Sequence, residues 1–330
     1  MNLTKFNQSN GCDHSSCTER SVTPAVYILL YVCSAAVILL TVCGNLLVII
    51  SVLHFKQLHT PTNMLLLSLA VSDFLLGTLV MPPLLIWTIE SCWIFGSDFC
   101  ISFLLIGGII MTVSIYNVAL IAVDRYLALS NPFLYMSSIS RRTMCIVVYS
   151  NWCVCITYMT TFYYFNGSFE NSVMCPGKCL VIVNEVWSVI NLVVLFIFPL
   201  SVIIILYTQV FVIAKKHATA IRELNNHTQP KTQKITSHSM KSERKAAKVL
   251  GILVSVFLVC LLPYYIYSLL GNVIELQTET LLKVVVVLHL NSTINPIIYA
   301  LFYPWFRRCV KLIITQQIFL TDSELMDVLS

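Results

Sequence analysis

Charged residues are scarce in this sequence. Lysine, arginine, aspartate and glutamate together make up 11% of the 330 residues, whereas a soluble domain carries about 25%. Hydrophobic residues reach 58%, and a chain this apolar would precipitate if water were its solvent. The composition therefore indicates a protein embedded in lipid, and no stretch has the basic density of a nucleic-acid-binding arm.

Three other features are also absent. The polar residues 1–24 lack a charged-then-apolar segment with a small-residue cleavage site, so the first apolar helix is expected to act as an uncleaved signal. A transporter, the alternative class, would show internal repeats with broken helices at matched positions, and the sequence has no such symmetry. Neither paired intramembrane aspartates nor a His-Glu-x-x-His motif indicates an enzyme. We expect a protein without enzymatic activity and without an organic cofactor.

Seven hydrophobic runs are each long enough to cross a bilayer, which takes about 20 apolar residues. Backbone groups cannot stay unpaired in lipid, so we expect an all-α fold, a seven-transmembrane helix bundle. The runs cover residues 25–53, 62–87, 98–130, 143–165, 186–214, 247–271 and 281–302. Tyr303 to Thr315 is amphipathic and predicts a short eighth helix on the membrane surface, within a C-terminal part that covers residues 303–330.

The distribution of lysine and arginine predicts the orientation. Nine of these residues lie in 215–248, and others lie in 131–142 and after Tyr303. This side is expected to be cytoplasmic, so residues 1–24 would be extracellular and the protein would lie in the plasma membrane. The bundle would cover residues 25–302, with 215–246 as the third cytoplasmic loop. The predicted outer side also holds glycosylation sequons at Asn2, Asn7 and Asn166 and six of the thirteen cysteines, where oxidising conditions favour disulfides.

Asp73 is the main ionisable residue in the middle of the predicted bundle. A polar group in lipid is costly and usually has a function. Its carboxyl group could be protonated and hydrogen-bonded. Alternatively, with Ser114, Asn291 and Ser292 it could bind a sodium ion, because hard cations prefer oxygen ligands. We favour the sodium site.

One recognisable motif occurs in each predicted helix. In chain order these are Gly44-Asn45, Leu69-Ala70-Val71-Ser72-Asp73, Asp124-Arg125-Tyr126, Trp152, Pro199 with Tyr207, Phe257 with Cys260-Leu261-Leu262-Pro263, and Asn295-Pro296-Ile297-Ile298-Tyr299. The set resembles the rhodopsin-like (class A) G-protein-coupled receptors over nearly the whole chain. Finer strings, including Glu90-Ser91-Cys92-Trp93 and Cys175-Pro-Gly-Lys-Cys179, resemble the trace amine-associated receptors. This resemblance implies an olfactory-type receptor that binds a small amine and activates a stimulatory G protein.

The resemblance also implies an activation switch at the cytoplasmic end. At rest Arg125 would pair with Asp124 and reach Glu243, and its release would allow contact with the G protein. The alternative is an arginine that only extends to the lipid headgroups. The other implied switch residues are Tyr126, Tyr207, Asn295, Pro296, Tyr299, Ile115, Pro199 and Phe257. The sequence departs from the family at Leu261, where a tryptophan is usual.

Two disulfides are implied in the same way. One would join Cys100 to Cys179 and hold the second outer loop over the ligand pocket. The other would join Cys175 to Cys12 or Cys17, and the role of Cys92 stays open, because connectivity cannot be deduced from a sequence.

The acid on helix three that binds the ligand in amine receptors is missing. In the family it lies eighteen residues before the arginine of Asp-Arg-Tyr, which is Gly107 here, and His289 replaces the tyrosine that supports it. An ammonium ion in a low-dielectric pocket still needs a counter-charge. Glu185 is the first candidate for a displaced acid, before Glu279 and Glu275, although each could be a solvated rim acid. An atypical amine or diamine therefore competes with a non-amine ligand.

The predicted ligand-binding residues come from helices three, five, six and seven. They are Gly107, Gly108, Met111, Thr112, Glu185, Asn191, Tyr264, Tyr265, Ser268, Val285 and His289. Tyr264 and Tyr265 could offer cation–π faces to an amine, or shape and hydroxyl groups to a neutral ligand. His289 is expected to be a neutral imidazole bonded to a neighbouring helix, with direct ligand contact as the alternative. The two glycines could instead serve close helix packing.

Overall fold

The computed structural model describes residues 23–165, 177, 179, 185–227, 233–270, 278–319, 324, 326 and 328. Several predicted features lie outside these residues. They are the sequons at Asn2, Asn7 and Asn166, the cysteines Cys12, Cys17 and Cys175, the acid Glu275 and the side chain of Glu243.

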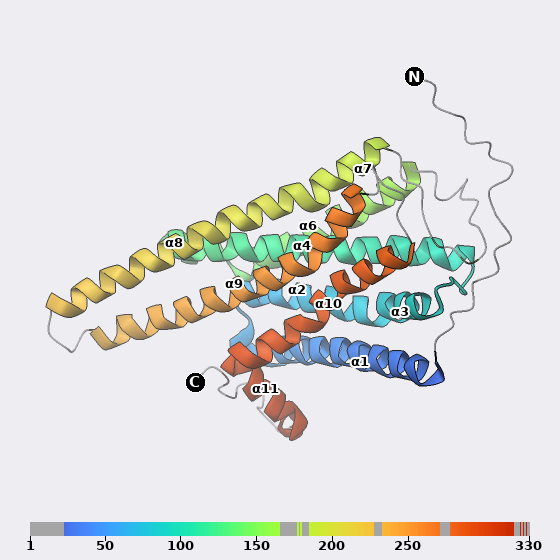
Figure 1. Ribbon diagram of the computed structural model, residues 1–330. Helices are drawn as coiled ribbons and strands as arrows, with labels where there is room; N and C mark the ends of the chain where they lie inside the picture. Colours follow the sequence, from blue (N-terminus) through green and yellow to red (C-terminus); the bar gives the residue numbers. More distant parts are fainter. Residues whose placement is uncertain are drawn as a thin grey trace.

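Seven helical segments are long and apolar enough to cross a membrane, and they lie side by side as a bundle (Figure 1). They are α1 (Pro24–His54), α2 (Pro61–Leu75) continued by η2 (Leu76–Val80) and α3 (Met81–Glu90), α4 (Ser97–Ser130), α6 (Arg141–Phe165), α7 (Glu185–Leu192) continued by η3 (Val193–Ile197) and α8 (Phe198–His227), α9 (Gln233–Leu270), and α10 (Thr278–Phe302). The described residues contain no β-strand, only an isolated bridge between Trp93 and Gly177. The all-α seven-helix prediction is confirmed.

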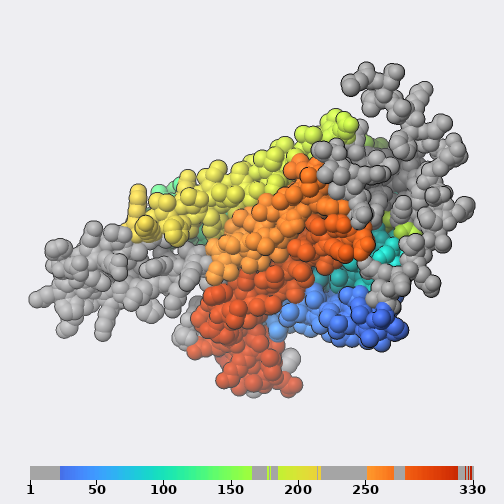
Figure 2. Space-filling model, viewed as in Figure 1, coloured from blue at the N-terminus to red at the C-terminus, as the bar shows by residue number. Residues whose placement is uncertain are grey.

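The outer surface of the bundle is apolar. Leu29, Val32, Val154 and Phe211 each expose more than half of their side-chain surface, between 59% and 71%. A helix that is hydrophobic all round lies either in a protein core or in a membrane. The exposed hydrophobic residues therefore form the lipid-facing surface of a multi-pass membrane protein. Figure 2 shows one face of the bundle in space-filling form, with α1 in blue, α8 in yellow and α9 and α10 in orange.

Two of the spanning segments are interrupted by a π-helical turn. η2 precedes Pro82 and Pro83, and η3 precedes Pro199. Proline has no backbone N–H and clashes with the preceding turn, and a wider π turn accommodates this break in the hydrogen-bond ladder. Each interruption contains a residue that lines the central cavity, Val80 in η2 and Leu195 in η3.

The end of the bundle that the sequence predicts to be cytoplasmic contains two further features. α11 (Pro304–Ile314) buries Trp305, Phe306 and Cys309 against the bundle and exposes Arg307 and Arg308, as expected for the amphipathic eighth helix. The segment predicted as the third cytoplasmic loop, 215–246, lies between the spans that end at Ile213 and begin at Gly251, and it is largely helical. α8 continues to His227 and α9 begins at Gln233. Hydropathy marks where lipid ends, whereas lysine, glutamate, alanine and arginine in this segment sustain a helix in water.

Candidate functional site

A cavity of about 340 Å³ lies within the bundle, enclosed by residues of η2, α3, α4, α6, α7, η3, α9 and α10. Nine of the eleven predicted ligand-binding residues line it. These nine are Gly107, Gly108, Met111, Thr112, Asn191, Tyr264, Tyr265, Val285 and His289. Its volume is within the range of small-molecule sites, about 300–1,000 Å³.

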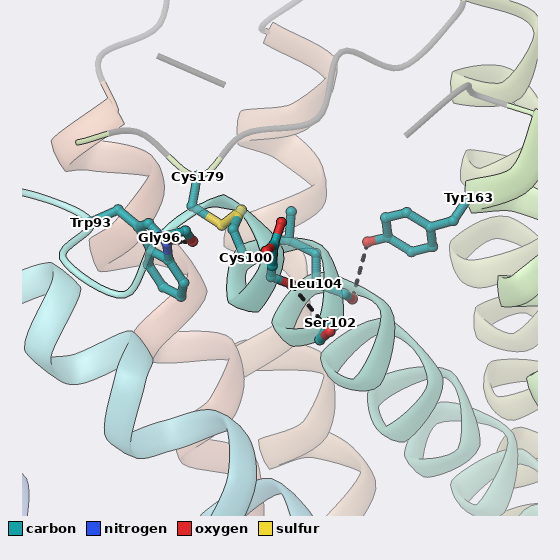
Figure 3. Close-up of a disulfide and its surroundings, with 8 residues drawn as sticks. Trp93, Gly96, Cys100, Ser102, Leu104, Tyr163 and Cys179 are labelled. Atoms are coloured by element: carbon teal, nitrogen blue, oxygen red, sulfur yellow. Dashed lines mark hydrogen bonds between the residues drawn. A yellow bond between two sulfur atoms is a disulfide. The ribbon is translucent and has the colours of Figure 1, made fainter. Parts of the chain in front are cut away.

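The roof of the cavity is tied to α4 by a disulfide. Cys100 bonds to Cys179, with their Cα atoms 5.6 Å apart, and Cys179 lines the cavity (Figure 3). The predicted disulfide is therefore confirmed. Beside it, the backbone N–H of Trp93 donates to the Gly177 carbonyl at 2.9 Å, and the indole N–H of Trp93 donates to the Gly96 carbonyl at 2.7 Å. Cys92, whose role was open, is also disulfide-bonded.

The two glycines of α4 have different surroundings. A Cβ atom at Gly107 would lie 3.5 Å from the nearest atom of Val80, an ordinary contact, so this wall has room for a side chain. A Cβ atom at Gly108 would lie 2.4 Å from Cε of Met159. Gly107 therefore opens the cavity, whereas Gly108 allows α6 to pack closely against α4.

Most hydroxyl groups on the lining are bonded within the protein. Tyr163 donates to the Leu104 carbonyl at 3.0 Å (Figure 3), and Tyr265 donates to the Leu195 carbonyl at 3.1 Å. Thr112 donates to the Gly108 carbonyl of its own helix at 2.8 Å. These bonds fix the walls and leave few polar groups for a ligand.

His289 is buried and bonds to its own helix. Nδ1 lies 2.6 Å from the Val285 carbonyl oxygen, one turn earlier in α10. The expectation of a bond to a neighbouring helix is wrong. A histidine on an apolar face can satisfy itself along the helix axis, and the sequence does not show which carbonyl it meets.

The described lining of the cavity contains no carboxylate. Glu185 begins α7 and is exposed, and Ser268 lies one turn further out than Tyr264 and is also exposed. Neither residue is among those that line the cavity, so their role as ligand contacts stays a prediction. Glu279, the next candidate acid, forms an exposed ion pair with Lys283 at 2.8 Å. The sequence places Glu185 near a helix end but cannot show that its side chain points into water.

Asp73 is fully buried below the cavity region, among uncharged polar groups. The Ser292 hydroxyl donates to Oδ1 at 2.6 Å, Asn295 Nδ2 donates to Oδ2 at 2.7 Å, and Ser114 is a further hydrogen-bond partner. Oδ1 of Asn291 is buried without a hydrogen-bond partner. Asn291 directly precedes Ser292 on α10, and a buried carboxylate among oxygen-bearing side chains fits a hard cation, which takes oxygen ligands. Asn295, absent from the predicted sodium ligands, belongs to this cluster through its motif on α10.

At the end of α4 opposite the Cys100–Cys179 disulfide, Asp124 is the centre of a second polar cluster. Its carboxylate accepts from Arg125 Nη2 at 2.5 Å, from Thr62 at 2.9 Å and from the Tyr135 hydroxyl at 2.7 Å. Burial and the bond to Asp124 raise the pKa of Tyr135, which lies outside the spans, so its phenol stays protonated as a donor. Sequence reasoning missed Thr62 and Tyr135, because a threonine and a tyrosine near a helix end carry no signal of their own.

The remaining predicted switch residues lie along the core. Ile115 and Phe257 are each 1% exposed, Pro199 is buried, and Leu261 packs into the same cluster at 2% exposure. Leu261 therefore fills the position of the family's tryptophan as a packing residue. The hydroxyl groups of Tyr207 and Tyr299 are buried without a hydrogen-bond partner in the described part of the chain. Leaving such groups unpaired is costly, and the role of both residues in a switch stays a prediction.

Comparison with known proteins agrees with this geometry. Residues 44–299 match the family model described as 7 transmembrane receptor (rhodopsin family). The chain is 38% identical to trace amine-associated receptor 13c of Danio rerio, an alignment that covers 94% of this chain and 92% of the relative. It is 38% identical to trace amine-associated receptor 4 of Mus musculus, again over 94% and 92%, and 35% identical to trace amine-associated receptor 6 of Pan troglodytes, over 96% and 94%. The chain therefore belongs to the rhodopsin-like G-protein-coupled receptors, within the trace amine-associated receptors.

Proposed function

We propose that this receptor binds a small organic molecule in the central cavity and, in response, activates a stimulatory heterotrimeric G protein. The observation that carries the proposal is that one helix, α4, connects both sites. Gly107 lines the cavity and Arg125 lies in the cytoplasmic cluster, eighteen residues later. At 1.5 Å per residue the two positions are about 27 Å apart along a continuous helix. A ligand that shifts α4 or its neighbours can therefore act on the Asp124–Arg125 pair.

The proposed orientation places residues 1–24 outside the cell and the basic segment 215–248 in the cytoplasm. The excess of lysine and arginine on the proposed inner side supports it. In this orientation the sequons at Asn2, Asn7 and Asn166 would be available for glycosylation.

The class of ligand is approached first through the relatives, which are named for trace amines. An amine, including a diamine or an atypical amine, is therefore the first compound class to test. A non-amine ligand is the second candidate. It is favoured by the absence of a carboxylate from the described lining and by the exposure of Glu185.

An allosteric sodium ion at Asp73 forms part of the proposal. Asp73, Ser114, Asn291 and Ser292 would hold it, and the unpaired Asn291 oxygen supports the fit. The ion would supply a positive charge that compensates the buried carboxylate. It would stabilise the conformation in which these oxygens converge.

Cyclic AMP in cells that express the receptor tests the proposal. The panel would hold monoamines, diamines, polyamines and uncharged odorants, with surface expression measured on the same cells. We expect at least one compound to raise cyclic AMP in the wild type and not in Arg125→Ala at equal surface density. Silence of the whole panel in the wild type, with receptor confirmed at the surface, would contradict coupling to a stimulatory G protein.

A further inference from the structure

We infer that the cavity binds its ligand in an uncharged form and recognises a hydrogen-bond donor of that ligand through Nε2 of His289. The inference rests on the proposed function, because it specifies the ligand of the same cavity. It extends that proposal by naming the charge of the bound ligand, one recognising atom and the position that excludes cations.

The first step concerns charge. No lining residue in the described part of the chain is acidic or basic apart from His289. The acids at the outer end of the bundle are already solvated or paired, since Glu185 is exposed and Glu279 pairs with Lys283. A buried charge without a partner is strongly disfavoured, and a titratable group then binds in its neutral form instead.

The second step concerns the protonation of His289. A carbonyl oxygen can only accept a hydrogen bond, so the contact between Nδ1 and the Val285 carbonyl requires the proton on Nδ1. The neutral ring then carries a lone pair on Nε2. This atom makes no hydrogen bond within the described part of the chain, although the residue lines the cavity. His289 therefore presents an acceptor that an O–H or N–H group of a ligand can satisfy.

The third step concerns the remaining polar lining. Tyr264 lines the cavity, and its hydroxyl group makes no hydrogen bond within the described residues, whereas the hydroxyls of Tyr163, Tyr265 and Thr112 are bonded within the protein. The lining groups without a hydrogen bond in the described residues are thus the Nε2 acceptor of His289, the Tyr264 hydroxyl, the Nδ2 amide group of Asn191, whose Oδ1 accepts from Tyr158, and the indole N–H of Trp87; the rest of the walls is apolar. They match a small apolar molecule with one hydroxyl, amide or free-base amine group. They offer no ionic partner to an ammonium ion.

Gly107 is the position that sets this specificity. A side chain fits there, because a Cβ atom would meet only Val80 at 3.5 Å and 3.9 Å. Because Gly107 has no side chain, the cavity wall at this position is apolar and carries no acid. An aspartate introduced at this position would therefore supply a carboxylate to the cavity without steric conflict at its Cβ atom.

The experiment uses sets of three compounds that share a carbon skeleton and differ only in the polar group. Benzyl, cyclohexyl and hexyl compounds are each applied as the alcohol, the primary amine and the trimethylammonium salt, and cyclic AMP is measured against surface expression. We expect the alcohols to activate the wild type and the trimethylammonium salts to be at least about tenfold weaker, since a cation meets no carboxylate on the lining that the structure describes. An alkyl amine has a pKa of about 10.4, so its uncharged fraction and its potency should rise about tenfold per pH unit. The potency of the alcohols should not change with pH.

Two matched variants complete the test. Gly107→Asp should gain response to the trimethylammonium salts, whereas Gly107→Asn, with the same shape and no charge, should not. His289→Phe removes the acceptor and should weaken alcohols about tenfold more than the corresponding methyl ethers, which donate no hydrogen bond. A wild type that answers the trimethylammonium salts best, or amine potency independent of pH, would overturn the inference while supporting the proposed receptor function. Silence of every compound on every variant at the cell surface would instead reject the ligand-activated function itself.

Discussion

Replacing Asp124 with asparagine is expected to raise signalling in the absence of ligand. The carboxylate holds Arg125 through Nη2 at 2.5 Å and Nε at 3.0 Å, and its own side chain is 1% exposed. Asparagine keeps the shape but loses the charge and presents an N–H₂ group to one of these donors. In the activation switch that the family resemblance implies, the pair belongs to the resting arrangement, so its loss should favour the state in which Arg125 is released.

The magnitude follows from the number and burial of these bonds. A hydrogen bond to a charged partner contributes about 1.5–3 kcal/mol. The Arg125 side chain is 21% exposed, and water replaces part of the loss, so we take about 2 kcal/mol for the variant. A shift of about 2 kcal/mol changes the ratio of active to resting receptor about 30-fold. A receptor with about one molecule in a hundred active at rest would then have about one in four.

The assay is basal cyclic AMP divided by surface receptor, measured over a range of expression levels. Tyr135→Phe is the matched control, because it removes one neutral donor to Asp124 at 2.7 Å and leaves the ion pair intact. It should raise basal signalling about fivefold at most. Equal basal signalling of Asp124→Asn and the wild type at the same surface density would show that the ion pair does not restrain the resting state.

Three further predictions address other parts of the molecule. Replacing potassium with sodium at constant ionic strength should lower agonist potency about fivefold or more in the wild type and leave Asp73→Asn unchanged; equal sodium sensitivity in both would remove the proposed ion site. Burial raises the pKa of Cys309 to about 11, so at about pH 8 roughly one thiol in a thousand is ionised, and iodoacetamide should label it slowly until the receptor is denatured. Because folding raises this pKa, the stability contributed by the protonated thiol is present below about pH 9 and is lost as the pH rises through about 11. Fast labelling of the folded receptor, or palmitate on Cys309, would contradict this burial. Cys100→Ser should lower the thermal stability of the purified receptor and its surface expression. The disulfide joins residues 79 apart, and by restricting the unfolded chain it stabilises the folded state by roughly 4 kcal/mol. Cys33 is a free and exposed cysteine, so Cys33→Ser should behave as wild type.

The spans were predictable from the sequence because lipid imposes a simple rule. The predicted run 98–130 corresponds to α4 (Ser97–Ser130), and 143–165 corresponds to α6 (Arg141–Phe165). The ends of α8 and α9 in water were not predictable in this way, because polar helix formers carry no hydropathy signal. The π turns at η2 and η3 also escaped, since the prolines that accompany them only indicate some irregularity nearby.

The candidate site was partly predictable for a different reason. Gly107, Tyr264 and His289 lie on separate helices, and the resemblance to a known bundle was enough to bring them to one cavity. The direction of a single side chain was beyond the sequence. Glu185 points into water, and His289 bonds along its own helix. Both outcomes depend on local geometry that residue type and spacing do not determine.

Nucleotide exchange on a purified stimulatory G protein measures receptor function most directly. The receptor would be reconstituted in lipid nanodiscs, and exchange of GDP for GTP would be followed with and without the most potent compound of the cyclic AMP panel. We predict that the compound accelerates exchange on the wild type. Arg125→Ala should still bind the compound in the cavity but should no longer accelerate exchange. Exchange that no compound accelerates, with the receptor folded and the ligand bound, would contradict a G-protein-coupled function for this cavity.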